Sequence, residues 1–140
     1  MNFFLNIGSN IGNREANLSR AITLLQSLSS VPLKLSDIVE SEPWGFDSEN
    51  RFLNVAVLLV SDRDPHDMLR QLQAIEREMG SECHRTPSGD YADRLIDIDI
   101  MAIDNLVINS PSLIVPHPHL HDRPFFLMPY RQLLEDSMQD

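Results

Sequence analysis

The chain has 140 residues, of which 42% are hydrophobic and 23% charged, and its formal net charge is −10 at pH 7. This length suits one domain around one core, and no apolar run approaches the ~20 residues that a membrane span needs. The negative charge disfavours binding to a nucleic-acid backbone. We therefore expect a single domain over residues 1–140 that binds neither membranes nor nucleic acid.

The amino terminus and the cysteine content predict the compartment. Residues 1–13 lack the basic region and the long apolar run of a signal peptide. Cys83 is the only cysteine, so an intrachain disulfide is excluded, as is usual in a reducing compartment. We expect a cytoplasmic protein, and an ordinary acidic domain of this size is expected to be a monomer.

The pattern of apolar residues divides the chain into strands and helices. Strands are expected where apolar and β-branched residues alternate or run together, and helices where apolar residues recur every three or four positions. The segments predicted in this way are, in chain order, a strand at 2–7, a helix at 14–29, strands at 33–39 and 52–60, a helix at 65–79, a strand at 94–101, a short strand at 106–108 and a helix around 130–134.

Capping residues define two of these boundaries. Asp64 followed by Pro65 is typical of a helix start, and Gly80 ends the same helix. Before the first helix, Gly8-Ser9-Asn10 predicts a tight turn in which Ser9 or Asn10 caps the helix, although a short glycine turn of this kind is also compatible with phosphate binding.

The order β-α-β-β-α-β indicates the fold class. It is typical of the ferredoxin-like arrangement, an α+β fold in which an antiparallel sheet carries both helices on one face. A segment with four prolines between Pro111 and Pro124 is expected to add mostly loop before the final helix.

Two aspartates interrupt the aliphatic run Arg94–Met101. Successive strand residues point to opposite faces, so Asp97 and Asp99 share one face. Paired carboxylates repel unless a cation lies between them, and hard oxygen ligands suit Mg²⁺. The alternative is a half-exposed strand with its polar side in water.

Alternate histidines in the proline-rich segment leave a second metal hypothesis open. His117, His119 and His121, with Asp122, are conceivable zinc ligands. Pro116 and Pro118 argue against it, because they break any regular strand.

Several separated segments together resemble the 6-hydroxymethyl-7,8-dihydropterin pyrophosphokinase family. They occur in the order found in that family and span nearly the whole chain. The matching segments are Gly8-Ser9-Asn10, Glu42-Pro43-Trp44-Gly45, Phe52-Leu53-Asn54-Val55-Ala56-Val57, Ile75-Glu76, Asp93-Arg94, Ile96-Asp97-Ile98-Asp99-Ile100, Val115-Pro116-His117-Pro118 and Asp122-Arg123.

The resemblance implies transfer of the β,γ-diphosphate of ATP to the hydroxymethyl group of the pterin, with release of AMP in folate biosynthesis. It implies two Mg²⁺ ions held by Asp97 and Asp99, with Arg94 as a third catalytic residue. Catalysis would then rest mainly on positioning and electrostatics.

The resemblance also implies which residues bind each substrate. Asn54 is expected at the polar edge of the pterin, and Phe52 and Phe125 on the two faces of its ring. The full set implied for the pterin is Ser41, Pro43, Trp44, Gly45, Phe52, Asn54, Tyr91 and Phe125. The set implied for ATP is Gln73, Glu76, Arg85, Arg94, His117 and Arg123.

The chain departs from the family in the loop between Gly80 and Arg94. Family members commonly carry an arginine directly after that glycine and a tryptophan before the strand. Here Arg85 or His84 is the candidate for the arginine and Tyr91 for the tryptophan. The loop is polar, so we expect it to close over bound ligand.

Two alternatives belong to other functional classes. An inactive relative would bind nucleotide or pterin without turnover, because of the altered loop. An unrelated metal-dependent phosphohydrolase would use the same aspartates and release phosphate or diphosphate without pterin. An assay for AMP release distinguishes all three.

Overall fold

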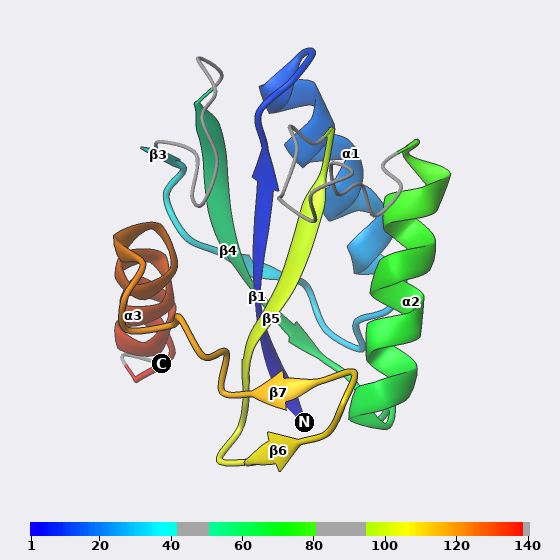
Figure 1. Ribbon diagram of the computed structural model, residues 1–140, viewed down its shortest axis with the longest axis vertical. Coiled ribbons are helices and arrows are strands. Elements are labelled where there is room, and N and C mark those ends of the chain that lie inside the picture. Colours follow the sequence, from blue (N-terminus) through cyan, green and yellow to red (C-terminus); the bar gives the residue numbers. More distant parts are fainter. Residues whose placement is uncertain (42–50, 81–94, 139–140) are drawn as a thin grey trace.

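A computed structural model describes residues 1–41, 51–80 and 95–138 of the protein (Figure 1). The strands and helices of these ranges are, in chain order, β1 (Asn2–Ser9), α1 (Arg14–Gln26), β2 (Lys34–Leu35), β3 (Val39–Ser41), β4 (Phe52–Val60), α2 (Pro65–Glu78), β5 (Asp97–Ile103), β6 (Ile108–Asn109), β7 (Ile114–Val115) and α3 (Pro124–Met138).

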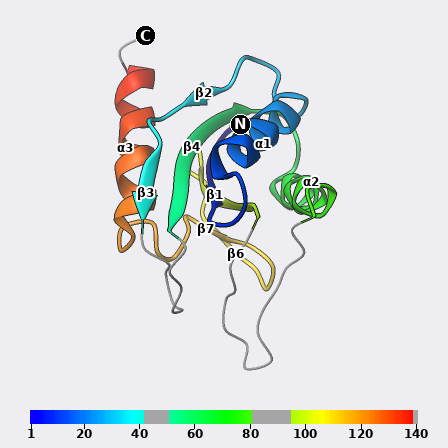
Figure 2. The ribbon, with the colours of Figure 1, turned by 90° about the horizontal axis from the view of Figure 1, so that it is seen from above.

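The main sheet is antiparallel, with the order β2-β4-β1-β5 and β3 paired to β4. If β2 and β3 are taken as one interrupted strand, this is the ferredoxin-like order, so the predicted α+β fold is confirmed. Viewed from above, α1 and α2 lie on one side of the sheet and α3 lies on the other (Figure 2). The sheet is therefore the middle of three layers.

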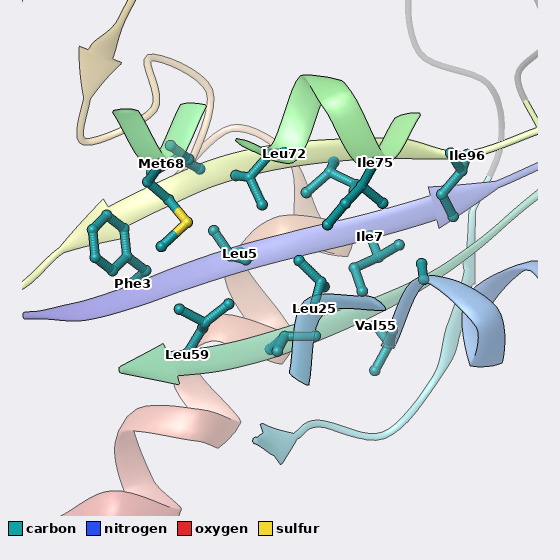
Figure 3. Close-up of a cluster of buried hydrophobic side chains, with 14 of the residues drawn as sticks. Phe3, Leu5, Ile7, Leu25, Val55, Leu59, Met68, Leu72, Ile75 and Ile96 are labelled. Atoms are coloured by element: carbon teal, nitrogen blue, oxygen red, sulfur yellow. The ribbon is translucent and has the colours of Figure 1, made fainter. Parts of the chain in front are cut away.

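Strand alternation gives each face of the sheet its own core. On the side of α1 and α2, the β1 residues Phe3, Leu5 and Ile7 are fully buried against helix side chains such as Leu25 and Leu72 (Figure 3). On the other side, Phe4 of β1 packs with residues of α3. Only part of this second face is apolar, because the residues beyond Phe4 on β1 are Asn6 and Gly8.

The strand expected at 33–39 is interrupted. From Leu35 to Val39 the chain advances four residues, while the partner strand advances three, from Val57 to Asn54, so one residue is extra. This is the count of a β-bulge, which bends a strand and locally breaks its pairing. β2 and β3 are consequently two short strands rather than one.

The carboxyl-terminal third differs most from the prediction. The short strand lies at Ile108–Asn109 and forms a hairpin with β7, which the sequence analysis did not predict. The last helix begins at Pro124 and continues through Pro129, well before the expected 130–134. A proline normally ends a helix, but packing of this helix on the sheet supports it here.

The helix boundaries are partly confirmed. Asp64 caps α2 by accepting from His66 N and Asp67 N, and Gly80 follows its end with φ +86°. The expectation that Ser9 or Asn10 caps α1 was wrong, because Asn13 does so and accepts from Ala16 N.

Within the described ranges, no helix combines the length and the apolar character that crossing a membrane requires. The loop predicted at 81–93 lies outside the described residues, as does the interruption predicted at 42–45.

Candidate active site

Polar residues gather on the face of the sheet that carries α3. The pairing of β1 with its two neighbours puts Asn54, Gly8 and Asp97 side by side across three strands. The next row on the same face holds Ala56, Asn6 and Asp99. Gly8 therefore lies between the amide of Asn54 and the carboxylate of Asp97.

Asp97 and Asp99 share this face, as the alternation of the strand predicted. Their neighbours Ile98 and Ile100 are buried in the core on the opposite face. The pKa of Asp99 is raised well above its ordinary value of 3.8, first by burial and then by the negative charges of Asp97 and Glu76. Without a cation, burial and the neighbouring carboxylates therefore make the charged form of Asp99 less favourable than in water.

Glu76 reaches the same strand from α2. Its Oε2 accepts a hydrogen bond from the backbone N of Ile98 at 2.9 Å. β5 ends the sheet, so every second N–H of this strand points away from β1 and needs another acceptor. Glu76 supplies one at the residue between the two aspartates, which places a third carboxylate beside them.

A chain of hydrogen bonds crosses the site on the side of β4. Asn6 Nδ2 donates to Asn54 Oδ1 at 3.3 Å, and Asn54 Nδ2 donates to Ser41 Oγ at 2.8 Å. Asn6 and Asn54 are each only 2% exposed. The chain fixes the orientation of the Asn54 amide, because each of its two ends already has a partner.

Gly8 leaves room for this arrangement. A Cβ at Gly8 would lie 3.0 Å from Asn54 Oδ1 and 3.2 Å from Cδ1 of Phe52. Both side chains therefore lean over Gly8, so any other residue there would displace them. This also places Phe52 beside Asn54 on the site face.

The segment before α3 brings His117 to the strand with the aspartates. His117 N donates to Met101 O at 2.9 Å, where β5 contains one residue more than β1. Burial lowers the pKa of His117 from 6.5 to about 4, with smaller effects from the positive charges of Arg123 and His119. Its Nδ1 accepts from His119 N at 3.0 Å, so the neutral ring carries its proton on Nε2.

Arg123 contributes positive charge to the described part of the site. It lowers the pKa of Asp99 and also that of His117, so its charge acts on both. Its guanidinium carbon lies 5.0 Å from the ring centroid of Phe126 and 5.9 Å from that of Phe125. Stacking on these rings holds the guanidinium in place.

The structure brings some of the predicted site residues together and places others elsewhere. It brings Ser41, Phe52, Asn54, Asp97 and Asp99 onto one face of the sheet. Phe125 lies at the start of α3 and is partly buried against Phe126, and Gln73 is exposed on α2. The predicted residues that lie outside the described ranges are Pro43, Trp44, Gly45, Arg85, Tyr91 and Arg94.

Asn6 is a site residue that was not predicted from the sequence. The available signal was an amide inside the apolar run Phe3–Ile7, at a position that shares a strand face with Gly8. A buried amide needs hydrogen-bond partners, which marks such a position as unusual.

The donor set suits a hard cation. The described ranges hold no group of three or more His, Cys, Asp and Glu side chains that could hold a metal ion. The zinc hypothesis for the histidines is therefore not supported. Mg²⁺ commonly takes only one or two carboxylates and completes its shell with water and phosphate oxygens, and Asp97 and Asp99 provide such a pair.

These features define a ferredoxin-like α+β protein with a paired-carboxylate site on the face of its sheet that carries α3. Residues 4–135 match the family described as 7,8-dihydro-6-hydroxymethylpterin-pyrophosphokinase. The chain belongs to this family.

Individual relatives agree. The chain is 44% identical over 127 residues to the 2-amino-4-hydroxy-6-hydroxymethyldihydropteridine pyrophosphokinase of Porphyromonas gingivalis, covering 90% of this chain and 86% of that protein. It is 35% identical over 133 residues to the enzyme of the same name from Bacillus subtilis, covering 94% and 77%.

A solved structure shares the fold. A crystal structure of a protein named HPPK-DHPS, in complex with substrates, matches with a TM-score of 0.64 and 15% sequence identity. The match covers 91% of this chain and 39% of that chain.

Proposed function

We propose that this protein transfers the β,γ-diphosphate of ATP to the hydroxymethyl group of 6-hydroxymethyl-7,8-dihydropterin, releasing AMP. The observation that carries the proposal is the placement of two carboxylates and an oriented amide on one sheet face, in a member of the pyrophosphokinase family. The carboxylates of Asp97 and Asp99 suit the phosphate end of the reaction. The amide of Asn54 suits the polar edge of a heterocycle.

In the reaction, the pterin hydroxyl oxygen bonds to the β-phosphorus of ATP. The bond between this phosphorus and the oxygen bridging it to the α-phosphate breaks. AMP leaves with that oxygen, and the hydroxyl proton is released. Asp97 and Asp99 would hold two Mg²⁺ ions, and these would supply positive charge to offset the negative charge that develops on the phosphates.

On the pterin side, Asn54 and Ser41 bind the polar edge of the ring, while Phe52 and Phe125 stack on its faces. The hydrogen bond from Asn54 to Ser41 supports this role, because an amide held in one orientation distinguishes donors from acceptors. Pro43, Trp44, Gly45 and Tyr91 remain predicted members of this half of the site.

On the nucleotide side, Arg123 supplies positive charge to the phosphates. Neutral His117 donates from Nε2, because its Nδ1 already accepts a hydrogen bond. Gln73, Glu76, Arg85 and Arg94 complete the proposed ATP set, with Arg94 also catalytic. We assign the reaction to a cytoplasmic monomer.

The test is AMP formation from ATP, Mg²⁺ and hydroxymethyldihydropterin, with each component omitted in turn. The proposal requires AMP only in the complete mixture. Phosphate or diphosphate release without pterin would favour a phosphohydrolase, and pterin binding without AMP formation would indicate an inactive relative.

A further inference from the structure

We propose that Asn6 is a specificity-determining residue of the pterin site, which orients Asn54 and accepts a hydrogen bond from an N–H or O–H donor of the heterocycle. This inference rests on the function proposed above. The observation behind it is the placement of the Asn6 side chain, which is 2% exposed and lies on the same sheet face as Asn54 and Asp99.

Within the described part of the chain, the side-chain amide of Asn6 is hydrogen-bonded at only one of its two ends. Its Nδ2 donates to Asn54 Oδ1, but its Oδ1 is buried and accepts no hydrogen bond within the described part of the chain. A buried carbonyl oxygen without a hydrogen-bond donor lowers the stability of the folded protein, so such oxygens are rare in native structures. An oxygen of this kind on a site face is suited to a donor from a ligand.

The position of Asn6 on β1 also suits a role in the site. Along β1, the neighbour of Asn6 on one side of this face is Phe4, which belongs to the apolar core under α3. The neighbour on the other side is Gly8, which has no side chain. Across the sheet, Asn6 faces Asp99 in the register of β1 with β5. Asn6 therefore stands where the apolar core ends and the polar site begins.

Asn6 is also coupled to Asn54 by a hydrogen bond. Asn54 has a partner at each end of its amide, Asn6 at the oxygen and Ser41 at the nitrogen. Loss of the Asn6 donor frees the Asn54 amide to turn over, which exchanges the donor and the acceptor presented to the ligand. Asn6 thus affects recognition of the heterocycle through its own oxygen and through Asn54.

The experiment measures binding of 6-hydroxymethylpterin and of a nonhydrolysable ATP analogue by calorimetry, together with steady-state kinetics. In Asn6→Ala we expect the Kd and the KM for the pterin to rise roughly tenfold, since one lost hydrogen bond is worth about that factor. Affinity for the nucleotide should stay within about twofold of wild type.

Ser36→Ala is the matched control. Ser36 is also buried, and its Oγ accepts from Ala56 N at 2.8 Å on the far side of β4 from β1. This variant loses a buried hydrogen bond of similar kind, so it should lower the melting temperature without changing pterin affinity. If both variants weaken the pterin equally, Asn6 has only a structural role and the inference is overturned.

Asn6→Asp provides a second variant of nearly the same shape, in case Asn6→Ala does not fold. A carboxylate cannot donate to Asn54 Oδ1, so pterin affinity should fall here too. Unchanged pterin affinity in a folded variant of either kind overturns the inference alone. If the wild-type protein neither binds pterin nor forms AMP, the proposed function fails and the inference fails with it.

Discussion

Glu76 Oε2 accepts a hydrogen bond from Ile98 N at 2.9 Å, so a helix side chain binds the edge of β5 between the two aspartates. One carboxylate thereby satisfies an edge N–H and adds negative charge beside Asp99. The strand is held where the charges are concentrated, which keeps the acidic pair in place although like charges repel. Glu76 therefore both holds β5 by a hydrogen bond and raises the pKa of Asp99.

Glu76→Gln should separate these two effects. Glutamine retains a carbonyl oxygen that can accept from Ile98 N but carries no charge, so the pKa of Asp99 should fall toward its ordinary value. Carboxyl NMR titration of the metal-free protein measures this pKa. Glu78→Gln, an exposed change on the same helix, is the control. An unchanged Asp99 pKa in Glu76→Gln would contradict the assigned cause.

Asp99→Asn should stabilise the metal-free protein at neutral pH. The pKa of Asp99 is raised in the folded state, so that state binds more protons than the unfolded chain between the two pKa values. The stability linked to the Asp99 carboxyl is fully present at pH values below its ordinary pKa, and it is lost as the pH rises through the pKa of Asp99 in the folded protein. Asparagine avoids this loss, so the melting temperature should rise by a few degrees, as about 1 kcal/mol gives.

The comparison for Asp99→Asn is Asp62→Asn, an exposed aspartate outside the site. This control should leave the melting temperature almost unchanged at pH 7. The stability gain of Asp99→Asn should also shrink on acidification, because wild-type Asp99 is then protonated as well. A lower melting temperature for Asp99→Asn at pH 7 would show that burial of this charge is not costly.

Asp97→Asn should remove turnover and leave pterin binding largely intact. The substitution keeps the shape of the side chain but removes a charge that a cation needs, so the rate should fall by about 100-fold or more. AMP formation measures the rate, and calorimetry with the pterin measures binding. Retained Mg²⁺-dependent turnover in this variant would rule out Asp97 as a metal ligand.

Gly8→Ala should weaken pterin binding by steric displacement. Its Cβ would lie 3.0 Å from Asn54 Oδ1 and 3.2 Å from the Phe52 ring, so both side chains must shift. We expect the pterin Kd to rise about tenfold, as for loss of one good hydrogen bond. Calorimetry with the pterin checks it.

Gly12→Ala is the contrasting glycine variant. Gly12 has φ +71°, so a side chain there strains the backbone by roughly 1–2 kcal/mol. The nearest atoms to its Cβ are side-chain atoms of Leu95 and Asn17 at 3.6 and 3.7 Å, which are ordinary contacts. This variant should lower the melting temperature and preserve pterin affinity. The opposite pattern in the two variants would refute the role given to Gly8.

His117 should make stability fall on mild acidification. Its pKa is about 4 in the folded protein, against an ordinary 6.5, chiefly because of burial. The unfolded chain therefore binds the proton first, and stability is lost as pH falls from about 6.5 through about 4. NMR titration of the ring should report a pKa near 4, and urea unfolding at several pH values should show the loss.

In His117→Asn the amide oxygen can replace Nδ1 as the acceptor from His119 N, and it does not titrate. This part of the pH dependence should therefore disappear. His121→Asn, an exposed histidine nearby, should leave the dependence unchanged. A ring pKa close to 6.5 in wild type would show that His117 is not buried as described.

The sequence by itself determined the features that local periodicity encodes. The alternation of Ile96–Ile100 fixed that Asp97 and Asp99 share a face, and the run Phe52–Val60 matches β4 at both ends. The cap at Asp64 and the glycine at position 80 gave the bounds of the second helix within two residues. These features depend on residues close together in the chain, so no knowledge of pairing was needed.

The tertiary structure alone decided what lies opposite these residues. Strand pairing placed Asn6 and Gly8 between Asn54 and the aspartates, and helix packing brought Glu76 to Ile98. Packing against the sheet also decided that α3 continues through Pro129 on the face that holds the site, although proline disfavours a helix interior. Contacts between residues far apart in the chain depend on register, bulges and packing, which local patterns do not encode.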